Sequence, residues 1–243
     1  MKERRTYGRE FYMEGDAAAR DAAKVIVPIL MDLVRPASST GSGQALTASS
    51  PRSSSDGTAS VNEPVGRPTS VVDVGCGVGT WLAVFREHGV ARIVGVDGPW
   101  VSSDQLVIPQ ECFVQMDLEN PGPLSDRFDL AVCLEVAEHL PETSAEALVA
   151  FVTGLSPVVL FSAAIPQQGG VHHVNEQWPE YWEGKFARHG FVAIDCIRPK
   201  VWHDGRVAPW YRQNILLYCR QEHLNVNEVL RKEYECRRAY PSP

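Results

Sequence analysis

Val71-Val72-Asp73-Val74-Gly75-Cys76-Gly77-Val78-Gly79-Thr80 is the stretch that decides the fold. A run of β-branched residues is typical of a buried parallel strand. The alternate glycines that follow permit backbone conformations and close approaches that a Cβ atom would prevent. A strand, a glycine turn and the start of a helix together predict a site for a nucleotide-like cofactor.

The spacing of the glycines separates two kinds of cofactor. A dinucleotide site has the pattern G-x-G-x-x-G, in which the helix N-terminus faces a pyrophosphate. Here the pattern is G-x-G-x-G, and an acid precedes the first glycine by two residues. This spacing argues against an NAD-dependent oxidoreductase. That class remains the alternative, because its second strand also ends in an acid that binds a ribose.

Three more strand ends follow in order. Residues 91–97 form an expected second strand ending in Asp97, residues 112–118 a third with Asp117 and Leu118 at its end, and residues 128–135 a fourth ending at Glu135. The carboxyl ends of parallel strands lie at one edge of a sheet, where ligands bind. These signals therefore predict one binding edge.

The four strand ends resemble those of the class I S-adenosylmethionine (SAM) methyltransferases. The resemblance implies a seven-stranded, Rossmann-like α/β sheet with helices on both faces and an antiparallel seventh strand between the fifth and sixth. It also implies that Asp97 binds the ribose hydroxyls of SAM and that Asp117 binds the adenine amino group. The full set of cofactor-binding residues expected is Asp73, Gly75, Cys76, Gly77, Gly79, Asp97, Asp117, Leu118 and Cys133.

A second group of polar residues follows the fourth strand, in Glu135-Val136-Ala137-Glu138-His139. In the first turn of a helix, Glu135, Glu138 and His139 would share one face. With His173 from the segment after the fifth strand, they would form a divalent cation site. A set with mostly oxygen ligands favours Mg²⁺, while the histidines also suit Mn²⁺, Fe²⁺ or Zn²⁺.

This E-x-x-E-H run and the later histidine resemble the metal site of small-RNA terminal 2′-O-methyltransferases, and the run alone resembles ubiquinone-pathway O-methyltransferases. The resemblance implies catalytic roles for His139, His173 and Glu135 in methyl transfer to a hydroxyl. Two alternatives remain open: His139 or His173 acts as a general base without a metal, in N- or O-methylation, or these residues are structural. His172 is the competing candidate for the role of His173.

The chain divides into three parts by composition. Residues 1–35 are an expected N-terminal helical cap, with a helix over 16–34 that Pro28 should kink or break. Residues 36–70 are rich in Ser, Thr, Gly and Pro and predict a flexible insertion. Residues 71–243 form the catalytic core. Its remaining expected elements are a helix over 80–88, a helix begun by a Thr143/Glu146 capping box, strands over 157–162, 191–197 and 214–219, and helices over 178–189 and 225–237.

Composition limits the partners. The net charge of −7 opposes binding to nucleic acid, whose affinity depends on cationic groups. No apolar run reaches the roughly 20 residues needed to span a membrane, no signal peptide is visible, and scattered cysteines are typical of a reduced, cytoplasmic protein. We therefore expect a small hydroxylated acceptor, such as a sugar or natural product; a non-catalytic SAM-binding protein is the remaining alternative.

Overall fold

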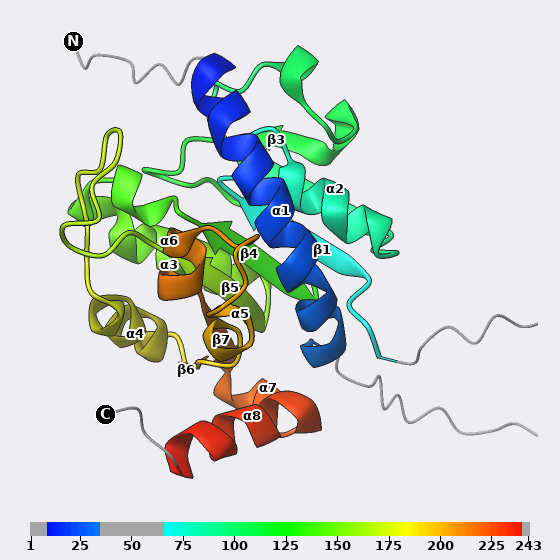
Figure 1. The fold of residues 1–243 in the computed structure, drawn as a ribbon, viewed down its shortest axis with the longest axis vertical. Coiled ribbons are helices and arrows are strands. Elements are labelled where there is room, and N and C mark those ends of the chain that lie inside the picture. The colour runs from blue at the N-terminus through cyan, green and yellow to red at the C-terminus, as the bar shows by residue number, and fades with distance from the viewer. Residues whose placement is uncertain (1–8, 35–65, 240–243) are drawn as a thin grey trace, which may run out of the picture.

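The computed structural model describes residues 9–34 and 66–239, which fold around one seven-stranded sheet (Figure 1). The strand order is β3-β2-β1-β4-β5-β7-β6. The order and the place of the last strand confirm the expected fold class. The strands are β1 (Ser70–Val74), β2 (Arg92–Asp97), β3 (Phe113–Gln115), β4 (Leu130–Leu134), β5 (Val158–Ser162), β6 (Phe191–Ile194) and β7 (Leu216–Arg220).

The sheet reverses its winding direction beside β1. This strand pairs in parallel with β2 on one side and with β4 on the other. The chain forms β2 and β3 on the first side of β1 and then crosses to the second side to form β4. In open α/β sheets this switch point opens a crevice at the carboxyl ends of the strands. The turn after β1 and the segment after β4 therefore lie at the expected binding edge. Strand β7 runs antiparallel to both β5 and β6.

Helices cover both faces of the sheet, and successive strand residues alternate between two hydrophobic cores. One core includes α1, α2 and the C-terminal helices, and the other includes α3 and α4. In Figure 1, α1 crosses in front of the sheet beside α2. The helices are α1 (Arg9–Leu33), α2 (Thr80–Glu87), α3 (Ala145–Leu155), α4 (Pro179–Arg188), α5 (Arg198–Val201), α6 (Pro209–Asn214), α7 (Gln221–Leu224) and α8 (Glu228–Ala239), with short 3₁₀ turns η1 (Ser103–Gln105), η2 (Gln110–Cys112), η3 (Ala137–His139) and η4 (Glu142–Ser144).

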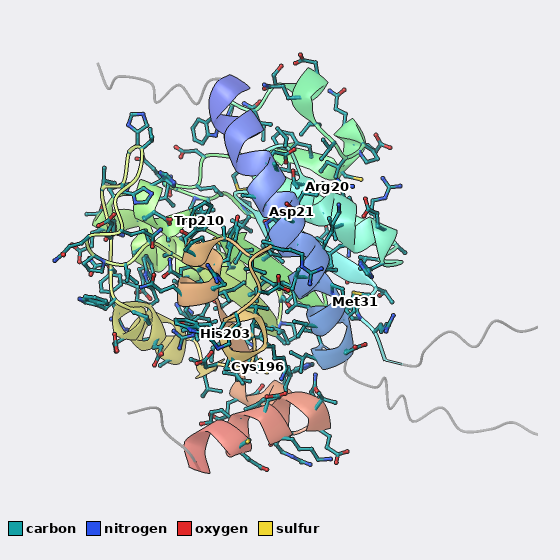
Figure 2. All side chains as sticks on the ribbon, viewed as in Figure 1. Arg20, Asp21, Met31, Cys196, His203 and Trp210 are labelled. Atoms are coloured by element: carbon teal, nitrogen blue, oxygen red, sulfur yellow. The ribbon has the colours of Figure 1, made fainter. Side chains whose placement is uncertain are left out.

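Helix α1 shares its core with the sheet. Ala22, Ile26 and Leu30 are fully buried on one face of this helix. Arg20, labelled in Figure 2, makes a 2.6 Å ion pair with Glu87 of α2. The helix continues through Pro28, because this packing outweighs the backbone hydrogen bond that proline removes.

The expected capping box is wrong. Helix α3 begins at Ala145 after the 3₁₀ turn η4, and its N-cap residue Ser144 makes no capping hydrogen bond through its side chain. The Glu146 carboxylate instead contacts Arg188 at 2.8 Å and His189 at 3.2 Å. Contact with these two residues at the end of α4 has replaced the local cap.

The predicted insertion, residues 36–70, falls mostly outside the described residues, and β1 already begins at Ser70. The described residues on either side of 35–65 meet on the surface, where the Arg67 guanidinium lies 2.9 Å from the Asp32 carboxylate at the end of α1. Among the described helices, none combines the length and apolar character needed to cross a bilayer.

Candidate active site

The glycine turn after β1 packs against two other segments of the binding edge. Gly75 and Gly79 have φ angles of 82° and 91°, in the region that favours glycine. A Cβ atom at Gly75 would lie 2.2 Å from Val136, and one at Gly79 would lie 2.8 Å from Ile108. The glycines therefore allow the turn to approach both the segment after β4 and the segment after β2.

Asp97, at the end of β2, is joined directly to this turn. Its carboxylate accepts hydrogen bonds from the backbone amides of Gly77 at 2.7 Å and Gly98 at 2.6 Å, and from the indole of Trp100. Burial raises the pKa of Asp97, and these three hydrogen bonds oppose the rise. The acid predicted to bind ribose thus also fixes the backbone around the binding edge.

Asp73 is a second buried acid beside the turn. Its side chain lies within β1 and is almost fully buried, with 3 % exposed. Burial, and then the nearby charge of Asp97, raise the pKa of Asp73 to about 8. A carboxyl group with such a pKa holds a proton at neutral pH, and a cationic ligand would favour its ionised form.

The other predicted cofactor residues differ in their surroundings. Leu118 is buried, and burial raises the pKa values of the Cys76 and Cys133 thiols. Asp117 is exposed and accepts a hydrogen bond from the backbone amide of Glu119 at 2.9 Å. Its contact with adenine stays a prediction.

The segment after β4 does not form the expected α-helical turn. Glu135 has a φ angle of 54°, and residues Ala137–His139 form the 3₁₀ turn η3. The side chain of Glu135 is held by Gln168 Nε2 at 3.1 Å and Asn214 Nδ2 at 3.4 Å. The single helical face predicted for Glu135, Glu138 and His139 is therefore wrong, because the left-handed residue at the strand end interrupts the helical spacing, although the Glu135 side chain stays close to Glu138.

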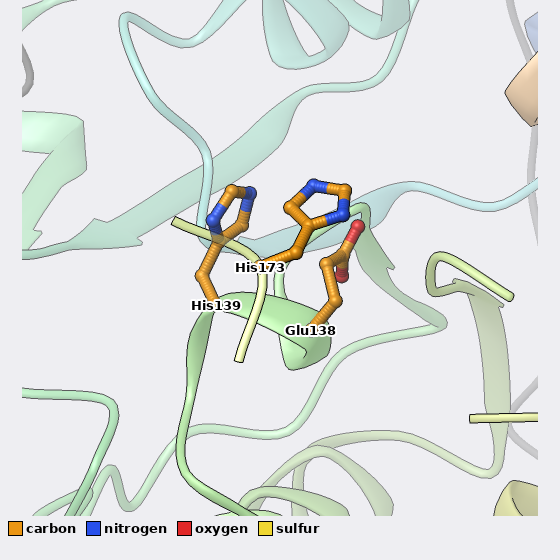
Figure 3. A group of neighbouring side chains, drawn as sticks. All are labelled: Glu138, His139 and His173. Carbon is orange, nitrogen blue, oxygen red and sulfur yellow. The ribbon is translucent and has the colours of Figure 1, made fainter. Parts of the chain in front are cut away.

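Three of the predicted ligand residues nevertheless come together. Glu138, His139 and His173 each offer one ligand atom, and these atoms lie within 4.8 Å of one another (Figure 3). The two imidazole rings pack edge to face with centroids 4.9 Å apart. The amides of Val174 and Asn175 donate to the Glu138 carbonyl at 2.8 and 3.1 Å, which draws the His173 segment against η3.

The Glu138 carboxyl is the least satisfied polar group of this cluster. Both of its oxygens are buried without a hydrogen-bond partner of normal geometry, although the Ala164 amide and the Glu135 side chain lie close enough to affect its pKa. Burial raises its pKa well above the usual range, and the nearby Glu135 carboxyl raises it further. A buried carboxyl beside two imidazoles fits the donor set of a divalent cation.

Comparison with known proteins identifies the family. Residues 46–193 match the model of a methyltransferase domain. The chain belongs to this methyltransferase family. With its class I sheet, it is a SAM-dependent methyltransferase, and not a dehydrogenase. No protein of curated function matches the sequence.

Solved structures resemble this methyltransferase at low identity. The magnesium protoporphyrin IX methyltransferase of Synechocystis PCC 6803, with bound SAH, is 19 % identical over 62 % of this chain and 74 % of its own, with a TM-score of 0.44. Human N-acetylserotonin methyltransferase with SAM is 16 % identical over 63 % and 48 %, with a TM-score of 0.45. The methyltransferase domain of bacterial CtHen1-CN is 20 % identical over 63 % and 90 %, with a TM-score of 0.44.

Three residues of the methyltransferase edge were missed from the sequence: Trp100, Gln168 and Glu176. Trp100 lies against Gly98, where a Cβ atom would be 2.2 Å from the indole ring. Gln168 and Asn214 bind Glu135, and Glu176 binds His173. Only Trp100 had a local signal, as an aromatic residue three positions after the strand-end acid. His172, by contrast, is exposed, with a φ angle of 63°.

Proposed function

We propose that this methyltransferase transfers the methyl group of SAM to a hydroxyl oxygen of a small molecule, with the help of a divalent cation held by Glu138, His139 and His173. The observation that carries the proposal is the buried Glu138 carboxyl, which lies beside two imidazoles within 4.8 Å and forms no ion pair with a lysine or arginine of the described residues. Leaving such a group without a counter-charge is costly in a protein interior. A cation at this position would remove the cost.

The residues present favour certain cations. One carboxylate and two imidazoles suit Mn²⁺, Fe²⁺ or Zn²⁺ better than Mg²⁺, which prefers oxygen ligands. Mg²⁺ would be favoured only if Glu135 left Gln168 and Asn214 and supplied a second carboxylate. When bound, the cation would lower the pKa of the acceptor hydroxyl.

The rest of the edge holds the methyl donor in the same proposal. Gly75, Gly77 and Gly79 shape the turn around the methionine end of SAM, and Asp97 binds the ribose. Asp73, Cys76, Asp117, Leu118 and Cys133 complete the cofactor contacts. The acceptor is a small hydroxylated molecule, such as a sugar or natural product, because a chain with a net charge of −7 has little to offer a phosphate backbone.

A chelation experiment tests the cation. Protein freed of metal, as verified by elemental analysis, should bind SAM normally in calorimetry and should bind Mn²⁺ or Zn²⁺ at one site. Glu138→Gln and His139→Ala should lose cation binding and keep SAM binding. The matched control is His172→Ala, which removes an exposed histidine one residue from the site and should change neither.

A metal-free mechanism is the second candidate. His173 has a carboxylate partner, Glu176, at 3.0 Å, as histidine general bases often do. The same experiment distinguishes the two mechanisms. Full methyl transfer by verified metal-free protein to an accepted hydroxyl or amine substrate would overturn the cation proposal and favour the general base.

A further inference from the structure

We propose that Glu176 is a positioning residue that fixes the tautomer of His173, so that the ring presents Nε2 to the reaction. The inference rests on the proposed function only in placing His173 at the reacting site. It applies equally to a cation ligand and to a general base, because both roles need a nitrogen with a free lone pair.

The contacts of Glu176 define the proton on His173. Its Oε1 accepts from the Gly169 amide at 2.9 Å and lies 3.0 Å from His173 Nδ1, and its Oε2 accepts from the Gln167 amide at 2.8 Å. An ionised carboxylate can only accept hydrogen bonds. The Nδ1 atom therefore carries the hydrogen, and in the neutral ring Nε2 carries the lone pair.

Gly170 of the same segment packs directly against the Nε2 edge of His173. A Cβ atom at Gly170 would lie 2.3 Å from Nε2 and 2.4 Å from Cε1 of His173. Any other residue at this position would block that edge of the ring. Glu176 thus holds one nitrogen of the ring, the absence of a side chain at Gly170 avoids a collision with the other, and the amides of Val174 and Asn175 tie the segment to the Glu138 carbonyl.

These contacts explain why Glu176 acts on position as well as on protonation. Its two backbone contacts, to Gln167 and Gly169, fold the segment back over His173. A carboxylate that orients a ligating histidine typically contributes 10- to 100-fold to metal affinity or activity. We expect an effect of this size here, in whichever of the two roles His173 takes.

Nitrogen-15 NMR of the metal-free protein tests the tautomer directly, with the His173 signal assigned by its loss in His173→Gln. The wild type should carry the proton on Nδ1. Glu176→Ala should lose this preference and lower the affinity for Mn²⁺ or Zn²⁺ by roughly 10- to 100-fold, while SAM affinity stays unchanged. Glu176→Gln keeps an acceptor oxygen and should restore part of both.

The control is Glu146→Ala. Glu146 also contacts a histidine, His189, at 3.2 Å, but this pair joins the start of α3 to the residue after α4 and does not involve His173. It should leave the His173 tautomer and the cation affinity unchanged. A His173 proton on Nε2 in the wild type, or an unchanged tautomer in Glu176→Ala, would overturn the inference. A wild type that binds no cation but keeps the Nδ1 proton would refute the cation proposal and leave the inference standing.

Discussion

The Asp73 carboxyl should make the folded protein less stable as the pH rises. Its pKa is about 8 in the folded state, against an ordinary value of 3.8. Between these values the folded protein holds a proton that the unfolded chain has released. The stabilisation is fully present below about pH 4 and is lost as the pH rises through 8. Each pH unit inside this window costs about 1.4 kcal/mol.

Asp73→Asn should remove this dependence. Between pH 5 and pH 7 the free energy of unfolding of the wild type should fall by about 2.7 kcal/mol more than that of the variant, from two pH units at the same slope. Asp97 and Glu138 also have raised pKa values, so they too make the free energy of unfolding fall as the pH rises. Both residues remain in the variant. The difference between the two proteins therefore reports on Asp73 together with its interaction with Asp97.

Urea unfolding at pH 5, 6 and 7 measures this difference. Asp117→Asn is the matched control, because it removes an exposed carboxyl at another strand end and should run parallel to the wild type. Parallel curves for wild type and Asp73→Asn would refute the reasoning, since they would mean that Asp73 is ionised in the folded protein throughout this range.

Three further changes test other parts of the structure. Asp97→Ala removes the acceptor of the Gly77 and Gly98 amides and should weaken SAM binding by about one to two orders of magnitude in calorimetry, since hydrogen bonds to a charged group contribute ~1.5–3 kcal/mol; unchanged affinity would remove Asp97 from the cofactor site. Gly170→Ala places a methyl group against His173 and should abolish cation binding while SAM binding persists; normal cation affinity would show that Nε2 is not the ligand atom. Replacing residues 35–65 by a short linker should preserve the thermal midpoint and turnover, because Arg67 and Asp32 already join the flanking segments; a folded variant without turnover would assign these residues a role in catalysis.

The sequence could predict the fold because its signals are local. The run from Val71 to Thr80 contains a buried strand, a turn and a helix start in ten residues, and the structure forms all three. The later strand ends repeat the same local pattern. These strands are apolar on both faces, so helices must cover both faces of the sheet. Helices that connect successive strands in this way make the strands parallel.

The orientation of Glu135 could not be predicted in the same way. Its side chain is bound by Gln168, 33 residues later, and by Asn214, 79 residues later. Its φ angle of 54° interrupts the helical spacing on which the prediction depended. Glu176 was missed for a related reason, since its effect on His173 depends on how a segment without regular structure folds back on itself.

Charge explains why this edge should favour cationic ligands. Asp73, Asp97 and Glu138 are buried there, and burial is the main cause of the raised pKa of each. Among the described residues, no lysine or arginine forms an ion pair with any of the three. The positive charge that would stabilise the ionised carboxylates must then come from what binds. In the proposed site, the sulfonium and ammonium groups of SAM would supply it on the side of Asp73, and a divalent cation would supply it beside Glu138. Both ligands favour the ionised carboxylates. An acidic solution should therefore weaken the binding of SAM and of the divalent cation. Near neutral pH, the binding of either ligand should release protons from these carboxyl groups.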